Sequence, residues 1–395
     1  MTQRRGTPLR VAMIGHAFMG AAHSQAWRSA PRFFELPRDV VMAVVCGTDA
    51  GRTGAAAERL GWAEAATDWR AVVARDDIDL VDVCTPGDTH AEIALAALEA
   101  GKHVLCEKPL ANTVDEARSM AEAADKAERS GVRSMVGFTY RRVPAIALAR
   151  ELVRAGRIGQ VRHVRAQYLQ DWIADPEAPL SWRLVKERAG HGALGDIGAH
   201  IVDLTQFITG DQVAEVSGYL DTFVTERPLP TAHSGLSGTA DATQRGAVTV
   251  DDAASFLARF TSGAMGVFEA TRFATGRKNA IRIEVNGARG SLAFDFEDMN
   301  VLNFFDAEED VVTAGFRRML VTEPDHPYVG AWWPPGHLLG YEHAFSHQVV
   351  DLVRAIDEGV NPSPSFDEGY QVQRVLEAVA VSSELRTWQD TEEVA

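Results

Sequence analysis

Short apolar runs alternate with helical patterns through the first 138 residues of the chain. The runs span residues 9–14, 40–46, 79–84, 103–106 and 132–138. The helical patterns between them span residues 20–30, 53–60, 91–100 and 114–130. Runs without a polar face are typical of strands buried on both sides, and strands that alternate with helices pair in parallel. We therefore expect a doubly wound α/β domain over residues 1–138.

The pattern changes after residue 139. Helices are predicted over 146–155, 198–209, 342–358 and 368–388, and strands over 161–170, 255–260, 264–271, 281–285 and 291–296. Turns containing glycine separate the last four strands, which favours antiparallel pairing. Segments 226–247 and 324–340 contain proline and glycine and are interpreted as long surface excursions. We expect residues 139–395 to form a second, α+β domain.

Composition and charge argue against several classes of protein. The chain has 395 residues, of which 46% are hydrophobic and 24% charged, and this balance suits a globular protein of two domains. Its 39 basic and 55 acidic residues give a formal charge of -16, which repels nucleic acid and anionic membranes. Cys46, Cys84 and Cys106 have no metal-ligand spacing and are too few for a disulfide framework. We therefore expect a cytoplasmic protein without a nucleic-acid or membrane partner.

The first residues resemble an export signal only superficially. Arg4-Arg5-Gly6 precedes an apolar stretch, as in a twin-arginine signal. That stretch runs directly into Gly15 and offers no small-residue cleavage site, so it is interpreted as the first strand. No run approaches the ~18 apolar residues that a membrane helix requires.

A glycine-rich turn, GHAFMG over residues 15–20, joins the first strand to the first helix. Glycines at such a turn let the backbone approach a diphosphate, whose charge is received by the amides at the helix start. Alanine replaces the usual central glycine, and its methyl group is expected to move the diphosphate slightly outward. A tight turn without a ligand is the alternative. We predict that Gly15, Ala17, Phe18, Met19 and Gly20 bind a nicotinamide dinucleotide.

The second strand lacks the acidic residue that usually ends it. Cys46-Gly47-Thr48 occupies the strand end, and Asp49 follows. A carboxylate there accepts hydrogen bonds from both ribose hydroxyls and repels a 2′-phosphate, whereas Arg52 would attract that phosphate. We therefore include Asp49 among the cofactor-binding residues and expect NAD, with NADP as the second candidate. A helix-capping role is the alternative for Asp49.

A Glu-Lys-Pro turn, residues 107–109, follows the fourth strand. Ligands bind beyond the carboxyl ends of strands in open parallel sheets, so this turn places an ammonium near the nicotinamide end of a cofactor. Such a lysine can polarise a substrate hydroxyl and stabilise developing negative charge. In isolation it would more often be a surface residue, but beside the glycine turn we predict a catalytic Lys108. The further residues predicted to bind the cofactor at this edge are Thr85, Pro86, His90 and Glu107, together with Lys108.

The segment Gly195-Asp196-Ile197-Gly198-Ala199-His200 is predicted to begin a helix. Positions four apart share a helix face, so Asp196 and His200 can point into one cleft. Hydride transfer from a carbinol needs a base for the hydroxyl proton, and imidazole suits neutral pH. A capping aspartate and a buried histidine are the alternative. Asp-x-x-x-His lacks a third zinc ligand, so we expect no metal.

Together these motifs resemble those of the Gfo/Idh/MocA family, which includes glucose-fructose oxidoreductase and inositol dehydrogenase. The likeness covers nearly the whole chain and includes the glycine turn, Thr85-Pro86, Glu-Lys-Pro and Asp-x-Gly-x-His. It implies an active site formed by Lys108, Asp196 and His200. It also implies a Rossmann domain over 1–138 and, over 139–395, a substrate-binding and oligomerisation domain built on a large, open, mostly antiparallel sheet. The expected assembly is a homo-oligomer, a dimer or tetramer.

Further segments, at 138–145, 168–172, 180–183 and 340–341, resemble a narrower branch of the family, the levoglucosan dehydrogenases. This likeness implies a substrate that is a sugar, anhydrosugar or inositol. Polar and aromatic side chains in these segments suit ring hydroxyls and the apolar face of a sugar. Trp172 and Trp182 can equally be packing residues, and Tyr140 can border the nicotinamide or only pack. The predicted substrate-binding residues are Tyr140, Gln170, Trp172, Trp182, Asp196, His200 and Tyr341.

We expect hydride transfer from a ring alcohol to the nicotinamide. His200 takes the hydroxyl proton, Lys108 holds the same oxygen, and Asp196 positions the substrate or the base; the sequence does not decide which of Lys108 and His200 is the base. Two alternatives are an NAD-dependent glycosidase, which regenerates its cofactor, and a non-catalytic, nucleotide-gated sugar-pathway regulator. A regulator need not retain all three residues, and their presence argues against it.

Overall fold

The computed structural model describes residues 6–234 and 237–394, which form two compact units. The first unit extends to Thr139 and also includes Tyr341–Gln371, a segment that falls within the predicted second domain. The second unit comprises Tyr140–Gly340 and the residues from Val372 onward. The Arg4-Arg5 pair lies outside the described residues. Within the described part of the chain, no helix is both long enough and apolar enough to cross a membrane.

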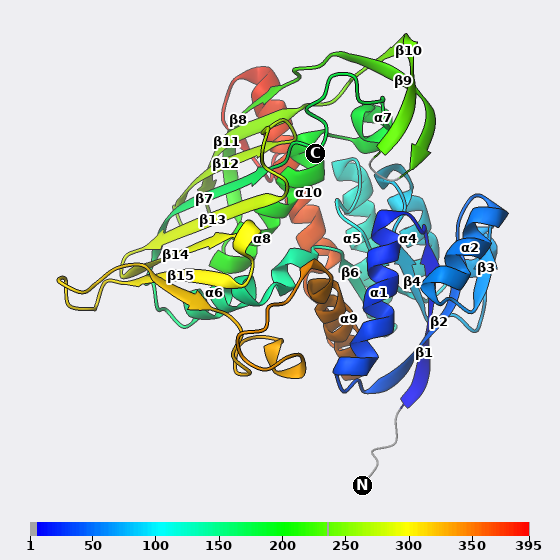
Figure 1. Cartoon of the computed structure of the whole chain (residues 1–395), viewed down its shortest axis with the longest axis horizontal. Coiled ribbons are helices and arrows are strands. Elements are labelled where there is room, and N and C mark those ends of the chain that lie inside the picture. The colour runs from blue at the N-terminus through cyan, green and yellow to red at the C-terminus, as the bar shows by residue number, and fades with distance from the viewer. Residues whose placement is uncertain (1–5, 235–236, 395) are drawn as a thin grey trace. The chain divides into compact units, whose positions relative to one another are not determined.

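A six-stranded parallel sheet forms the centre of the first unit, with strand order β3-β2-β1-β4-β5-β6 (Figure 1). Its strands are β1 (Gly6–Ile14), β2 (Arg38–Cys46), β3 (Glu64–Ala66), β4 (Leu80–Val83), β5 (His103–Cys106) and β6 (Ser134–Val136). The strand order reverses between β1 and β4, which is where doubly wound sheets bind ligands. The predicted Rossmann fold is confirmed.

Helices of the first unit form two groups. They are α1 (Phe18–Phe33), α2 (Ala50–Leu60), α3 (Trp69–Val73), α4 (His90–Glu99), α5 (Val114–Glu128) and α9 (Tyr341–Glu358). Helix α1 lies beside α2 and α9, whereas α4 lies beside α3 and α5. Trp27 of α1 and Phe345 of α9 belong to one buried apolar cluster with Leu9, Val11 and Met13 of β1. This packing holds α1 against β1.

A nine-stranded sheet forms the second unit, in the order β16-β15-β14-β13-β7-β12-β11-β8-β17. Its strands are β7 (Val161–Leu169), β8 (Val213–Asp221), β11 (Ala253–Phe260), β12 (Met265–Thr271), β13 (Ala280–Gly287), β14 (Gly290–Asp295), β15 (Val301–Asp306), β16 (Arg317–Leu320) and β17 (Gln389–Asp390). Among the described strands of this sheet, only β7 and β12 are neighbours that pair in parallel. The predicted large, mostly antiparallel sheet is confirmed.

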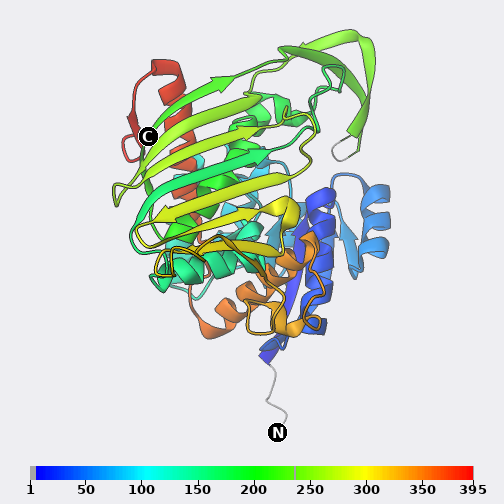
Figure 2. The same ribbon diagram turned by 60° about the vertical axis from the view of Figure 1, so that its left-hand side comes forward.

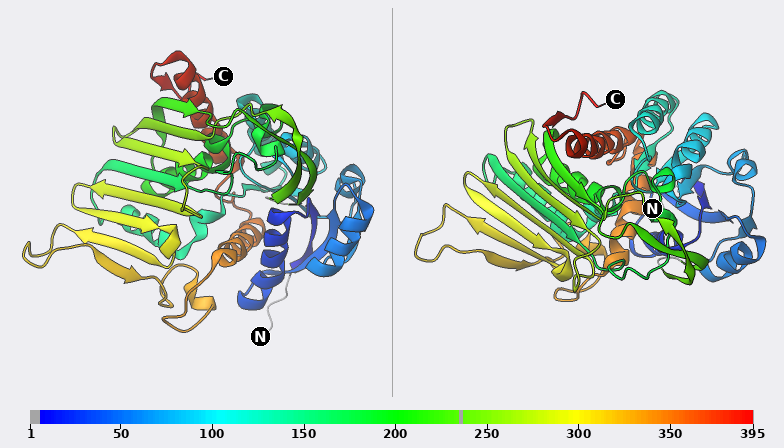
Figure 3. Two further views of the ribbon diagram at one scale, coloured as in Figure 1. Left: turned by 45° about the horizontal axis from the view of Figure 1, so that its top comes forward. Right: turned by 90° about the horizontal axis from the view of Figure 1, so that it is seen from above.

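Helices pack on one face of this sheet. They include α6 (Pro144–Arg154), α8 (Ala199–Thr209) and the end of α10 (Phe366–Leu385), and a short helix, α7 (Lys186–Ala189), lies in a connecting loop. Figure 2 looks onto the opposite face, and Figure 3 shows α8 and α10 on one side of the strands. Along β11 every second residue is buried, and residues on the opposite face, such as Leu257, are exposed. The sheet therefore has one packed and one exposed face.

The segment 226–247, expected to be a long surface excursion, forms regular β-structure over residues 226–234 and 237–247. Strands β9 (Glu226–Ser234) and β10 (Ser237–Ala247) form a separate two-stranded antiparallel sheet. Pro228 and Pro230 are compatible with β9 because each strand of a two-stranded ribbon has one unpaired edge, where a missing N–H group costs no ladder bond. Residues 324–340 contain, as regular structure, one short 3-10 turn (Val329–Ala331).

Candidate functional site

The turn between β1 and α1 is closed tightly around its glycines. Gly15 has a φ of +98°, and a Cβ atom there would lie 2.6 Å from the carbonyl oxygen of Cys84. A Cβ atom on Gly20 would lie 2.2 Å from the carbonyl oxygen of Gly15. The residue that precedes the helix is Ala17, so no side-chain cap occupies the first amides of α1. Uncapped amides in a turn flanked by two glycines fit the diphosphate of a dinucleotide.

Asp49 lies after β2 as the N-cap of α2. Its Oδ1 accepts a hydrogen bond from the backbone amide of Arg52 at 2.8 Å. This bond lowers the pKa of the Asp49 carboxyl. The side chain is 50% exposed, so the carboxylate is accessible to a ribose while it caps the helix. The capping alternative is therefore observed, and the role of Asp49 toward a ribose stays a prediction.

His90 links the two other predicted cofactor-binding turns. Its Nε2 lies 2.9 Å from the carbonyl oxygen of Thr85, and its Nδ1 lies 2.9 Å from the carbonyl oxygen of Pro109. The ring is 1% exposed. His90 thus ties the turn after β4 to the turn after β5, which contains Lys108.

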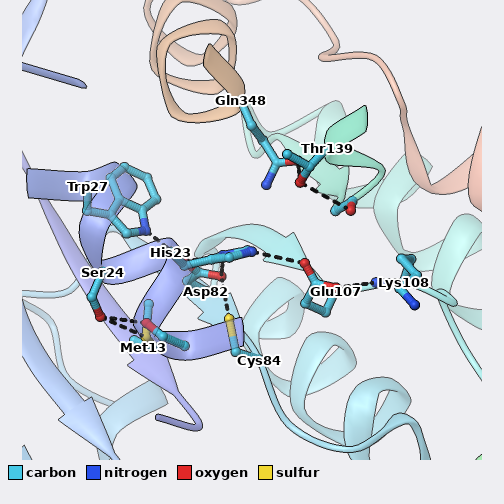
Figure 4. A network of polar contacts seen from close by, with 12 residues as sticks. Met13, His23, Ser24, Trp27, Asp82, Cys84, Glu107, Lys108, Thr139 and Gln348 are labelled. Carbon is cyan, nitrogen blue, oxygen red and sulfur yellow. Dashed lines mark hydrogen bonds and ion pairs between the residues drawn. The ribbon is translucent and has the colours of Figure 1, made fainter. Parts of the chain in front are cut away.

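Behind the Lys108 turn lies a buried polar network that the sequence analysis does not include (Figure 4). His23 contacts Asp82 through Nδ1 and Glu107 through Nε2, at 3.0 Å and 2.9 Å. The backbone amide of Lys108 donates to Glu107 Oε2 at 3.3 Å. His23, Asp82 and Cys84 offer ligand atoms within 4.8 Å of one another. These groups already bind one another, and burial raises the pKa of the Cys84 thiol, so the cluster is a poor metal site.

In the second unit, Asp196 lies in a π-helical turn, Leu194–Gly198, ahead of α8. The carboxylate of Asp251 accepts hydrogen bonds from the amides of Gly192 and Leu194, both at 2.7 Å. A Cβ atom on Gly192 would lie 1.7 Å from the carbonyl oxygen of Asp251, so only glycine fits there. Asp251 therefore holds the turn that presents Asp196.

A buried guanidinium faces Asp196. Arg272 is 0% exposed, and its Nη1 lies 3.4 Å from Oδ2 of Asp196. Its Cζ lies 5.7 Å from the ring centroid of Trp172, a cation-π contact. Burial lowers the pKa of the nearby Arg183, an effect that the charge of Asp196 opposes. Asp196 is thus set in a positively charged environment.

His200 is 8% exposed and packs against two tyrosines, with ring-centroid distances of 4.7 Å to Tyr140 and 5.8 Å to Tyr168. The two tyrosine hydroxyls lie 3.0 Å apart. Oδ1 of Asn279 accepts hydrogen bonds from the Tyr168 hydroxyl at 2.7 Å and from the Gln170 amide at 2.8 Å. Amide and hydroxyl groups therefore form a connected set beside the imidazole.

Trp172 continues this set, because its Nε1 donates to Gln170 Oε1 at 3.0 Å. Its ring also packs against a small apolar cluster that contains Ile173 and Leu184, so the packing alternative is observed as well. Trp182 contacts the guanidinium of Arg183, at 4.5 Å from its ring centroid.

The structure brings five predicted residues of the second unit into one connected set. They are Tyr140, Gln170, Trp172, Asp196 and His200. Tyr341 instead belongs to the first unit, where its ring stacks on Phe18 of the glycine turn at 6.3 Å. The residues of this neighbourhood that the sequence analysis missed are Tyr168, Asp251, Arg272 and Asn279. Tyr168 lies in the segment 168–172 but was not assigned a role, and the other three follow no motif whose spacing links them to Asp196 or His200.

Amides that receive a diphosphate, and an ammonium beyond the carboxyl end of another strand of the same sheet, are what a nicotinamide-dependent oxidoreductase requires of its nucleotide-binding half. Residues 9–138 match the family model described as oxidoreductase family, NAD-binding Rossmann fold, and residues 146–293 match the GFO/IDH/MocA C-terminal domain. Over 391 residues the chain is 41% identical to levoglucosan dehydrogenase of Pseudarthrobacter phenanthrenivorans, covering 98% of this chain and 99% of that protein. The chain therefore belongs to the Gfo/Idh/MocA family.

Solved structures agree with this assignment. An oxidoreductase domain protein from Kribbella flavida is 72% identical, with a TM-score of 0.93 over 98% of this chain and 100% of that one. Levoglucosan dehydrogenase in complex with NADH and levoglucosan is 40% identical, with a TM-score of 0.91 over 98% of this chain and 100% of that one. The predictions of the family, of an oxidoreductase and of NAD as cofactor are confirmed. The glycosidase and regulator alternatives are not favoured.

Proposed function

We propose that the chain is an NAD-dependent dehydrogenase that oxidises a ring hydroxyl of an anhydrosugar of the levoglucosan type, within a wider class of sugars and inositols. The observation that carries the proposal is the chain of contacts that links Tyr140, beside His200, to Gln170 and Trp172, and Trp172 through Arg272 to Asp196. Hydroxyls and amides suit the hydroxyls of a sugar ring, and an indole face suits its apolar side. The 41% identity to levoglucosan dehydrogenase supports the same substrate class.

Bound NAD would supply the acceptor for the hydrogen that leaves the ring carbon. We propose that Gly15, Ala17, Phe18, Met19 and Gly20 hold its diphosphate and Asp49 its ribose. Thr85, Pro86, His90, Glu107 and Lys108 are proposed to hold its nicotinamide half. Because Asp49 would repel a 2′-phosphate, NAD is the expected cofactor and NADP the weaker one.

The acid-base work belongs to three side chains in this proposal. His200 takes the proton of the reacting hydroxyl, because imidazole is the side chain whose chemistry suits general-base work at neutral pH. The rings of Tyr140 and Tyr168 pack against it and hold it in place. Lys108 stabilises the negative charge that develops on the same oxygen. Asp196 is fixed by Arg272 and orients a substrate hydroxyl or the imidazole.

We also propose a division of labour, with cofactor binding in residues 1–138 and substrate binding and subunit contacts in residues 139–395. The exposed face of the nine-stranded sheet is the proposed contact in a homodimer or homotetramer. Tyr219, Leu257, Met265 and Val267 are 63, 44, 47 and 42% exposed on this face. Exposed apolar side chains gathered on one surface mark an interaction site. Three free, buried cysteines favour a reducing cytoplasm.

The test is a panel of anhydrosugars, pyranoses and inositols, each supplied with NAD and with NADP. Levoglucosan with NAD is expected to give the fastest rise in absorbance of the reduced cofactor, whereas a glycosidase would give no net rise. Replacing Lys108 or His200 by Ala is expected to lower kcat by roughly 100-fold or more, as loss of a general acid-base group does. Near wild-type turnover in both variants would refute the assigned roles.

A further inference from the structure

His23 lies on α1, three residues after Gly20, and its ring is 1% exposed. The imidazole contacts two carboxylates on different strands of the sheet. Asp82 lies in β4, and Glu107 lies directly after β5 (Figure 4). No part of the proposed reaction uses this histidine. Its position nevertheless joins the helix that begins at the glycine turn to the residue that precedes Lys108.

Both ring nitrogens of His23 face carboxylate oxygens. Nδ1 lies 3.0 Å from each oxygen of Asp82, and Nε2 lies 2.9 Å from Glu107 Oε1. A neutral imidazole can donate only one hydrogen bond, whereas an imidazolium donates two. Burial by itself lowers the pKa of His23, but Asp82 and Cys84 together more than offset this effect, and the pKa is raised well above its ordinary value. The geometry and the charges both favour the imidazolium.

Asp82 is the fixed end of this network. It is 0% exposed, and it accepts hydrogen bonds from Nε1 of Trp27 at 2.7 Å and from the thiol of Cys84 at 3.4 Å. The ring of Phe345 packs on His23 with centroids 5.4 Å apart. These contacts leave the imidazole little freedom to rotate away from Glu107.

Glu107 is the other end. It is 4% exposed, its Oε1 contacts His23, and its Oε2 accepts the backbone amide of Lys108. A Cβ atom on Gly137 would lie 2.6 Å from Glu107 Oε1, so the carboxylate packs directly against the backbone of that residue. Because Glu107 is fixed on both oxygens, the peptide that leads into Lys108 is fixed as well.

We propose that His23 is a positioning residue: a doubly hydrogen-bonded imidazolium that ties the helix of the diphosphate turn to the Glu107–Lys108 peptide and so sets where Lys108 presents its ammonium. The inference rests on the proposed role of Lys108. Because His23 orients Lys108 and does not contact the substrate, loss of His23 should slow the chemical step more than it weakens binding of substrate or cofactor. A displacement of about 1 Å at a reacting group can cost roughly 100-fold in rate.

The test replaces His23 by Gln, which keeps a hydrogen-bond donor but has neither the charge nor the second ring nitrogen. We expect H23Q to lower kcat with levoglucosan by about 10- to 100-fold, while the Kd for NADH and the KM for the sugar change less than threefold. H103Q is the matched control. His103 lies at the opposite end of β5 and accepts a hydrogen bond from the amide of Arg133, so kcat should stay unchanged. A wild-type kcat in H23Q would overturn the proposal.

A double-mutant comparison separates orientation from general damage. If His23 acts through Lys108, H23Q lowers the residual kcat of K108A by less than twofold, because coupled residues are not additive. If H23Q lowers kcat by the same factor in K108A as in the wild type, the proposal is contradicted. If K108A loses about 100-fold or more in kcat and H23Q is fully active, this inference fails while the proposed role of Lys108 stands. Near wild-type turnover in K108A instead rejects the role of Lys108 on which the inference rests.

A measurement on the unmodified enzyme covers the case in which H23Q does not fold. Long-range ¹H–¹⁵N NMR of the histidine rings should show the His23 ring protonated on both nitrogens at pH values above the ordinary histidine pKa of about 6.5. E107Q should remove the downfield N–H signal of the Nε2 proton. A His23 ring that loses a proton at the ordinary histidine pKa would overturn the assignment.

Discussion

Replacing Gly20 by Ala tests the glycine turn more sharply than any other single change. The added Cβ atom would lie 2.2 Å from the carbonyl oxygen of Gly15 and 3.3 Å from Sδ of Met13. Contacts below 3.0 Å are essentially never seen for a real Cβ atom, so the first turn of α1 must move away from β1 by at least 0.8 Å, the difference between 3.0 and 2.2 Å. The oxygen belongs to the backbone and cannot rotate out of the way.

The magnitude follows from hydrogen-bond geometry. Amides that bind a diphosphate do so within a window of about 2.7–3.2 Å, so a shift of this size breaks at least one such bond. A hydrogen bond to a charged group contributes about 1.5–3 kcal/mol. At 1.4 kcal/mol per tenfold change, the Kd for NADH should rise by about 10- to 150-fold.

The assay is calorimetric or fluorescence titration of the wild type and of G20A with NADH. The matched control is G54A, because Gly54 lies within α2 and a Cβ atom there meets nothing within 4 Å. Alanine at a helix-interior glycine should raise stability by about 0.5–1 kcal/mol and leave NADH binding unchanged. If G20A binds NADH as tightly as the wild type, the turn does not hold the diphosphate as argued.

Three further predictions address stability, the second unit and assembly. Burial, reinforced by Arg38, lowers the pKa of His103 to about 4, below its ordinary value of 6.5. The neutral ring therefore stabilises the fold above pH 6.5, and this contribution to stability is lost as the pH falls toward 4. Between these pH values the melting temperature should fall more steeply with decreasing pH in the wild type than in H103Q. Equal slopes of melting temperature against pH would refute this prediction. D251A removes two hydrogen bonds from the turn that carries Asp196 and should lower kcat/KM by about 10- to 100-fold with a stability loss of about 1–3 kcal/mol; unchanged kinetics would contradict the role of Asp251. L257E combined with V267E should yield monomers in sedimentation analysis, and an unaltered oligomer would place the contact elsewhere.

The parallel sheet could be predicted because its strands are buried on both faces and appear as uninterrupted apolar runs. Strand β3 and helix α3 were not predicted because three and five residues are too few to display a period. Strand β8 mixes glycine and serine with exposed Tyr219, which hides its alternation. The β9–β10 hairpin was missed because its prolines argue for a loop, although a ribbon edge tolerates them.

The residues of the candidate site likewise divide into those that a local sequence pattern predicts and those that it does not. The glycine turn, the Glu-Lys-Pro turn and the Asp-x-Gly-x-His segment are contiguous in the sequence, so local chemistry is sufficient to propose them. Asp251 and Arg272 contact their partners only because β11 and β12 lie beside the π-helical turn. Such contacts depend on strand pairing across long stretches of chain, and no local pattern contains that information.

Transfer of hydrogen from the sugar carbon to NAD can be followed directly with levoglucosan deuterated at every carbon. In ordinary water, each turnover should yield one molecule of reduced cofactor that carries one deuterium, as read by mass spectrometry. A reduced cofactor without deuterium, or consumption of the sugar without any reduced cofactor, would contradict the claim that this chain oxidises a ring hydroxyl by direct transfer to NAD.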